Sequence, residues 1–240
     1  SQAFLKQVRA GAVPISSQPA IGDVLSEMEK LEGEKIVVLS MADGLSGTYQ
    51  SACSARELMP HKEDITVINT KTLCGPHRYI VQQALQMAKS GFSAEQLLQR
   101  LQRCIEDTKS YLIPQDYEFL RRGGRLTPFA AKINTILKLA PVVTQTQDGK
   151  KLERFAISRN FESAVKAIIQ GMQKQGVNDK HLITVSHADN DTAAQHAVKL
   201  LKSAFCATEI LVHELSPVFI TQGGPLCVAI QCCPKIQPAI

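Results

Sequence analysis

Tryptophan is absent from this 240-residue sequence, and aromatic residues make up only 5% of it. No apolar run approaches the ~18 residues that a membrane-spanning helix needs, and residues 1–12 lack the apolar centre of a signal peptide. No Cys-x-x-Cys pair, carboxylate cluster or Gly-x-x-x-x-Gly-Lys-[Ser/Thr] loop marks a metal or nucleotide site. We therefore expect a cytoplasmic protein with no stable membrane insertion, no metal and no cofactor.

Charge and cysteine content narrow the class of protein further. The net charge of +5 permits an anionic ligand, but the sequence lacks the concentrated basic stripe typical of nucleic-acid-binding proteins. The seven cysteines are odd in number, and the closest pair is the adjacent Cys232 and Cys233. Most lie in apolar segments such as "PLCVAIQCC", so we expect buried free thiols in a reducing compartment.

Hydrophobic periodicity predicts alternating strands and helices. Apolar positions three and four residues apart predict helices over Leu97–Ile105, which follows a capping box of Ser93 and Gln96, and over Phe161–Met172 and Ala193–Ala204. This alternation predicts an α/β protein with parallel pairing in at least the first half. Apolar, β-branched runs predict strands at Lys35–Ser40, Ile65–Asn69, Leu182–Ser186, Glu209–Glu214 and Cys227–Cys232.

A change of pattern near "TKSYLIPQD" suggests two domains. The stretch follows a long predicted helix and contains a proline. We interpret residues 1–110 as an N-terminal α/β domain and residues 111–240 as a C-terminal α/β domain. The sequence opens in the middle of a helical pattern with no strand before it, so we expect the N-terminal domain to lack its first strand.

Two turns are rich in hydroxyl groups. "ISSQP" (Ile15–Pro19) precedes a predicted helix, and its serines could either cap that helix near Ile21 or bind a ligand. "GLSGTYQSA" (Gly44–Ala52) follows an apolar strand and offers two hydroxyls with free backbone amides at a helix start. Such a turn is either a capped strand-to-helix connection or a site for a negatively charged group.

A third turn, "FLRRGGRLTP" (Phe119–Pro128), places three arginines around two glycines. Arginine presents a planar fork of donors that matches a carboxylate or a phosphate. A solvated basic surface loop is the alternative explanation. A nucleic-acid contact is disfavoured because no aromatic residues or further basic patch accompany the loop.

Together these turns resemble the DegV-like fatty-acid-binding proteins of bacteria. "SSQP", "LSGTYQSA", "FLRRGGRL…LKLAPVV" and "AISRNFESAVKAI" follow the order and approximate spacing of that family's motifs over nearly all 240 residues. The resemblance implies two α/β domains with one long-chain fatty acid bound near their junction. It implies an apolar tunnel for the acyl tail, lined by faces such as Ala130–Leu139, and a carboxylate held under the polar turns.

The resemblance also implies a function other than catalysis. Proteins of this kind present the fatty acid to a separate ATP-dependent fatty acid kinase, and the acyl phosphate that forms is used in phospholipid synthesis. We therefore expect this chain to be a substrate carrier whose partners are a long-chain fatty acid and a kinase, with no nucleic acid involved.

The resemblance also implies which residues of this sequence bind the fatty acid. Ser16 matches the threonine of the family's TSQP, and Ser46 the serine of its SGTYQ, so these two and Thr48 are expected to hold the carboxylate. Gln222, in "QGGPL", occupies a position where the family has histidine; Leu226 replaces a family glycine. Glutamine can donate a hydrogen bond to the carboxylate, but it cannot become cationic.

The resemblance implies a role for two arginines in the handoff to the kinase. Arg125 matches the arginine of the family's GGR, and Arg159 matches an arginine further along. Both are expected to stabilise the phosphoryl-bearing product or the encounter with the kinase.

Two other functions remain open on the residues alone. A serine hydrolase would need glycine two residues after its serine, but Thr48 occupies that position after Ser46. The motif of a hydrolase nucleophile is therefore not matched, although His187 and His213 lie at predicted strand ends. A phosphosugar- or nucleotide-binding module is the stronger alternative, because hydroxyl and arginine turns also suit a phosphate.

Overall fold

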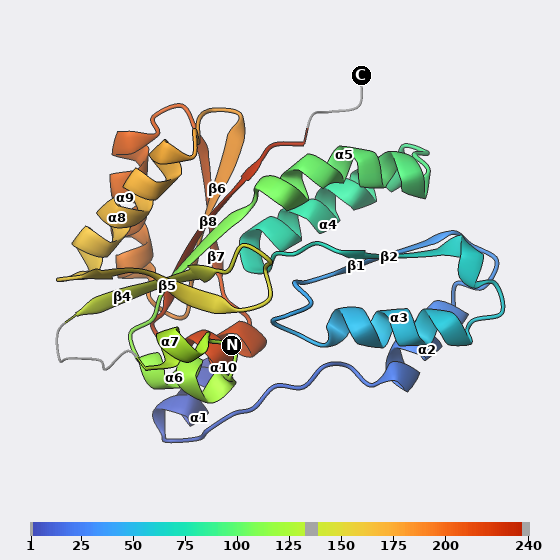
Figure 1. The fold of residues 1–240 in the computed structure, drawn as a ribbon, viewed down its shortest axis with the longest axis horizontal. Coiled ribbons are helices and arrows are strands. Elements are labelled where there is room, and N and C mark those ends of the chain that lie inside the picture. The colour runs from blue at the N-terminus through green and yellow to red at the C-terminus, as the bar shows by residue number, and fades with distance from the viewer. Residues whose placement is uncertain (1, 133–138, 237–240) are drawn as a thin grey trace.

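Two β-sheets organise the chain in the computed structural model, which describes residues 2–132 and 139–236 (Figure 1). The first is a parallel pair, β1 (Ile36–Ser40) with β2 (Ile65–Asn69), so the predicted parallel pairing in the first half is confirmed. The short 3₁₀ helix η1 (Lys62–Asp64) leads into β2. Among the described residues, no helix is both long and apolar enough to cross a bilayer.

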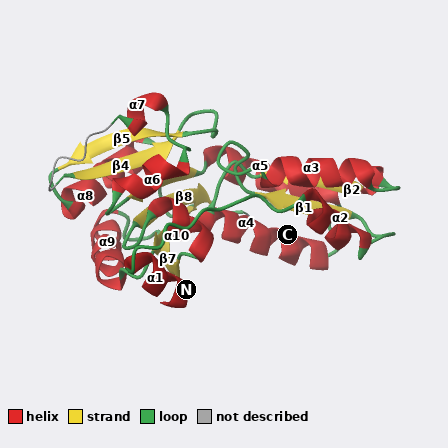
Figure 2. Ribbon diagram, turned by 90° about the horizontal axis from the view of Figure 1, so that it is seen from below, coloured by secondary structure: helices red, strands yellow, loops and turns green. Residues whose placement is uncertain are grey.

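Helices cover both faces of this small sheet. Figure 2 shows α3 on one face and α4 on the opposite one. On the first face, a cluster that includes Ala52, Ala55 and Met59 packs against Ile36 and Ile65. The helices are α2 (Ile21–Glu29) and α3 (Thr48–Leu58) on that side, with α4 (Cys74–Lys89) and α5 (Ala94–Asp107) on the other.

The second sheet is larger and mixed. Its strand order is β5-β4-β3-β8-β6-β7, in which β6 and β7 run parallel and the other neighbours antiparallel. The predicted domain boundary falls within β3, which pairs with β4 and β8. The strands are β3 (Lys109–Ile113), β4 (Ala140–Gln145), β5 (Leu152–Ser158), β6 (His181–His187), β7 (Glu209–Glu214) and β8 (Val228–Pro234).

The two faces of the larger sheet have different coverings. One face is closed by α8 (Phe161–Lys174) and α9 (Asp191–Ala204), whose apolar sides form the largest buried cluster with the sheet. The opposite face is shared between α4 and α5 at one end and four short helices at the other. These are α1 (Gln2–Arg9), α6 (Tyr117–Gly123), α7 (Pro128–Ala131) and α10 (Pro217–Gly223).

Residues 10–20 join the two parts of the molecule as an extended strap. The strap leaves α1, which packs on the larger sheet through Leu5, and runs to α2 beside the smaller sheet (Figure 1). A hydrogen bond from Ser51 Oγ to the Pro19 carbonyl (2.9 Å) ties its far end to α3. The strap therefore carries "ISSQP" across the junction between the two sheets.

Candidate functional site

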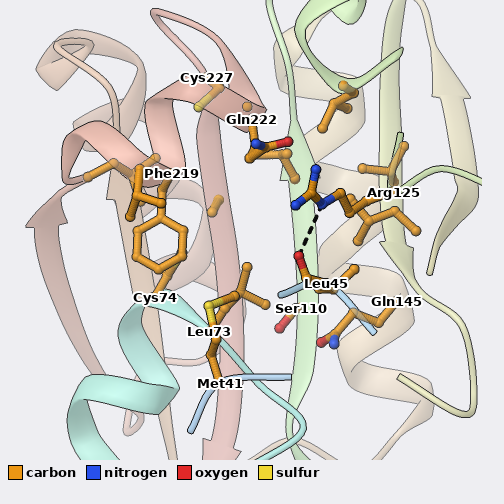
Figure 3. Close-up of a pocket in the computed structure, with 18 of the residues that line it drawn as sticks. Met41, Leu45, Leu73, Cys74, Ser110, Arg125, Gln145, Phe219, Gln222 and Cys227 are labelled. Atoms are coloured by element: carbon orange, nitrogen blue, oxygen red, sulfur yellow. Dashed lines mark hydrogen bonds between the residues drawn. The ribbon is translucent and has the colours of Figure 1, made fainter. Parts of the chain in front are cut away.

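A pocket lies over the α1–α10 side of the larger sheet, where the loops after β1 and β2 meet it (Figure 3). Its empty space, counting the part open to solvent, is about 990 Å³. Most of its wall is apolar. The apolar lining residues are Met41, Leu45, Leu73, Leu112, Leu120, Val143, Leu152, Leu215, Val218, Phe219 and Ala229.

The hydroxyl turn after β1 contributes Ser46 to this wall. Ser46 Oγ lies 2.8 Å from Thr48 Oγ1 and accepts a hydrogen bond from the Thr48 amide (3.3 Å). Because α3 begins at Thr48, the positive end of its dipole lies beside these hydroxyls. Thr48 itself is not among the described residues that line the pocket; its contact is with the Ser46 hydroxyl.

The strap places Ser16 opposite α10. Gln222 donates from Nε2 to Ser16 Oγ (2.8 Å), and both side chains line the pocket. A Cβ on Gly123 would lie 2.2 Å from Gln222 Oε1, so the glycine allows this approach. The alternative that the strap serines cap a helix is wrong: α2 begins at Ile21 after Ala20, and no side chain caps it.

Close packing brings the first two turns together. A Cβ on Gly47 would lie 1.5 Å from Gln18 Oε1, so the strap and the turn after β1 can touch only because residue 47 is glycine. Two of the predicted motifs, separated in sequence by a helix and a strand, thus meet at one side of the pocket.

Arg125 is the cation of the pocket wall. Its guanidinium donates from Nε to the Leu45 carbonyl (3.1 Å; Figure 3) and from Nη1 to the Gly123 carbonyl. Within residues 2–132 and 139–236, no carboxylate forms an ion pair with it. The basic turn is therefore more than a solvated loop at this position. Arg159, by contrast, is exposed directly after β5 and does not line the pocket.

The charge of the pocket does not depend on groups that titrate near neutral pH. Burial raises the pKa of the Cys74 thiol and raises that of Cys227 to about 12. Burial likewise raises the pKa of the Tyr111 phenol to about 12. These three and Arg125 are the ionisable side chains in the described lining. At neutral pH the lining thus carries one positive charge, which favours an anion.

Sequence reasoning missed three polar residues of the pocket floor. Ser110, Gln145 and Gln231 line it from β3, β4 and β8. Gln231 could have been found, because a glutamine inside the apolar run "VAIQCC" must either find buried partners or destabilise the strand.

The expected tunnel segment Ala130–Leu139 contributes differently. Residues 133–138 of that segment lie outside the described residues. Ala130 is fully buried in a cluster with Tyr117 and Leu120 and does not line the pocket.

Comparison with known proteins settles the family. A family model described as DegV matches residues 1–235. The chain belongs to the DegV family. A DegV domain-containing protein of Clostridium perfringens is 26% identical over 229 residues, which cover 93% of this chain and 78% of that protein. The resemblance inferred from the three turns is therefore confirmed.

Solved structures of other DegV proteins share this α/β fold. A fatty-acid-binding DegV family protein of Thermus thermophilus is 26% identical, with a TM-score of 0.85 over 98% of this chain and 84% of that one. A DegV family protein of Eubacterium eligens, solved with heptadecanoic acid, is 19% identical, with a TM-score of 0.83 over 98% of this chain and 85% of that one. The predicted α/β fold class is confirmed.

Proposed function

We propose that the pocket binds one long-chain fatty acid. The carboxylate lies near Ser16, Ser46, Arg125 and Gln222, and the acyl chain lies against the apolar wall. The observation that carries the proposal is a mostly apolar pocket with one arginine that no carboxylate of the described residues neutralises. Burial of each methylene contributes ~0.8 kcal/mol, while a buried carboxylate needs hydrogen bonds to offset its desolvation. The relatives solved as fatty-acid-binding proteins support this assignment.

The apolar wall also argues against the phosphosugar- or nucleotide-binding alternative. A sugar or ribose exposes hydroxyl groups on every side, and each would lose its hydrogen bonds to water against the leucines of this lining. A fatty acid has a single polar end, which matches the single cationic part of the pocket.

We further propose that the chain is a carrier that hands the fatty acid to a separate ATP-dependent kinase. The carboxylate becomes an acyl phosphate, which carries more charge than the acid and gains more from charge-assisted bonds to arginine. Arg125 lies where such a group would form, and the exposed Arg159 is available to a partner protein. This role requires neither a cofactor nor a nucleic acid in the carrier.

Mass spectrometry of the purified native protein tests the ligand. We expect a bound species with the mass of one fatty acid, released by organic solvent at one molecule per chain. The proposal fails if protein from several hosts carries no lipid and neither palmitate nor oleate binds when added. The handoff is tested separately, by whether a cognate kinase and ATP convert the bound acid to its acyl phosphate.

A further inference from the structure

A row of four polar side chains crosses the larger sheet, and three of them lie on the floor of the pocket. Ser110 on β3 lies opposite Gln231 on β8, and Gln231 lies opposite Thr184 on β6. Tyr111 lies opposite Thr144, so Gln145 at the next position of β4 extends the row beside Ser110. All four side chains therefore point to the same face of the sheet.

The row is an exception in its surroundings. Among the neighbouring positions on the same face, Leu112, Val143 and Ala229 line the pocket as apolar groups, whereas Ser186 on β6 is polar and buried. Ser110, Gln231 and Thr184 are at least nine-tenths buried. Most buried polar groups have partners that offset their desolvation, so the partners of Gln145 and Gln231 indicate the purpose of these two residues.

The partners of Gln145 and Gln231 lie in the loop that joins β2 to α4 and in the first turn of α4. Gln145 donates from Nε2 to the Lys71 carbonyl (3.1 Å), and Gln231 donates from Nε2 to the Leu73 carbonyl (3.1 Å). The Gly75 amide donates to Gln231 Oε1 (3.2 Å). Gln231 Nε2 also donates to Ser110 Oγ (2.8 Å), which fixes the orientation of the amide.

The loop is strained where the row holds it. Lys71 and Cys74 both have a φ of 52°, in the left-handed region that residues other than glycine rarely adopt. Such conformations persist when the surrounding structure imposes them. Leu73, the last residue of the loop, and Cys74, the first residue of α4, line the pocket.

We infer that Gln231 and Gln145 are positioning residues for the ligand, because they hold the strained loop so that Leu73 and Cys74 form a fixed wall of the pocket. The inference rests on the proposed fatty-acid function. A wall that cannot move rejects an acyl chain with one methylene too many, whereas a wall that can retreat accepts it. The row therefore sets how sharply the pocket discriminates between chain lengths.

Chain-length selectivity tests the inference with a matched control. Gln231→Leu and Gln145→Leu each remove an amide that bonds the loop. Thr184→Val changes the same row, but the Thr184 hydroxyl has no hydrogen-bond partner among the described residues. Affinities are measured by calorimetry for saturated acids of 14, 16, 18 and 20 carbons.

We expect the ratio between the best and worst chain to fall about four-fold or more in the glutamine variants, the discrimination that one methylene provides. Thr184→Val should keep the wild-type ratio. A loss of affinity that is equal for all chain lengths overturns the inference, because general destabilisation would produce that result.

Amide hydrogen exchange of the ligand-free protein separates this inference from the proposed function. The Gly75 amide should exchange at least ten times faster in Gln231→Leu than in the wild type or in Thr184→Val. Unchanged exchange overturns the inference, even if fatty acids bind. If the wild type binds no fatty acid, the proposed function fails while exchange still decides whether the row holds the loop. Should Gln231→Leu fail to fold, the half-exposed Gln145 provides the same comparison for the peptide around Lys71.

Discussion

Ser46 is the hydroxyl that most directly tests the proposed binding of the head group. It lines the pocket, and its bond to Thr48 orients it. Ser46→Ala removes one hydrogen bond to a partly buried carboxylate, at a cost of about 1.5–3 kcal/mol. We expect fatty-acid affinity to fall ten-fold or more by calorimetry, with little change in the melting temperature of the ligand-free form. Ser54→Ala, on the exposed side of α3, is the control. If the two variants bind the fatty acid equally well, Ser46 does not bind the carboxylate and has only a structural role in its turn.

Substitution of Arg125 tests how much its positive charge contributes to ligand binding. Its position in the wall predicts that Arg125→Ala weakens binding of the acid itself by about ten-fold, since a hydrogen bond to a charged group contributes ~1.5–3 kcal/mol. Acyl-phosphate formation by a kinase should fall further than binding does. The control is Arg122→Ala, because that guanidinium stacks on Phe119 (4.5 Å) away from the lining. Normal binding with lost turnover would instead restrict Arg125 to the product, the role that the family resemblance implied.

At the scale of elements, local patterns predicted α5, α8 and α9 well, but they did not predict the 16-residue helix α4. The capping box of α5 is present as predicted, with Ser93 Oγ accepting from the Gln96 amide (3.2 Å). Ser93→Ala should therefore lower the free energy of unfolding by about 1 kcal/mol, which a denaturant titration measures. Ser203→Ala, whose hydroxyl bonds only a carbonyl within α9, is the comparison and should change it less. A similar loss of unfolding free energy in both variants would mean that the capping hydrogen bond does not stabilise the helix more than an ordinary serine hydroxyl does.

The strands that sequence reasoning missed owe their pairing to distant residues. The strands β1, β2, β6, β7 and β8 were predicted within two residues of their ends because their apolar runs are evident locally. β4 begins "AP", and β5, "LERFAIS", is an edge strand whose burial does not alternate. β3, "KSYLI", was missed as well, because the sequence predicts a domain boundary there. All three are strands because neighbouring strands offer them backbone partners.

The candidate site likewise combines residues found from local motifs with residues brought together only by the fold. The three turns contain Ser16, Ser46 and Arg125, and the stretch "QGGPL" contains Gln222. The fold brings all four residues to one pocket. The row on its floor escaped notice because cross-strand register is a property of the folded sheet.

The whole molecule should lose stability in acid. His77 on α4 is partly buried, and its Nδ1 lies 3.0 Å from Thr70 Oγ1, which itself donates to the Ser40 carbonyl. Burial lowers the pKa of His77 below its ordinary value of 6.5. The unfolded chain therefore binds the proton first, and stability falls as pH drops through about 6.5.

Melting temperatures between pH 8 and pH 5 measure this dependence. Burial also lowers the pKa of His181 and of His213, so the three histidines act in the same direction. We expect His77→Gln to have a shallower decline than the wild type, while His61→Gln, at an exposed position, should decline as the wild type does. A wild-type melting temperature that rises on acidification would contradict the assignment.

Ligand binding should respond to pH quite differently from stability. The carboxyl group of a fatty acid is ionised above about pH 4–5, Arg125 stays charged, and the raised pKa values of Cys74, Tyr111 and Cys227 keep those groups neutral. Affinity should therefore be flat from pH 6 to pH 8.5.

Gln222→His places one titratable group beside Ser16 and provides the matched comparison. Its affinity should be higher at pH 6 than at pH 8, because an imidazolium near the carboxylate adds a charge-assisted bond that the neutral ring lacks. Calorimetry at both pH values decides the matter. A pH-dependent wild type would mean that a group outside the described lining titrates with the ligand, and a flat Gln222→His variant would mean that the carboxylate does not lie near residue 222.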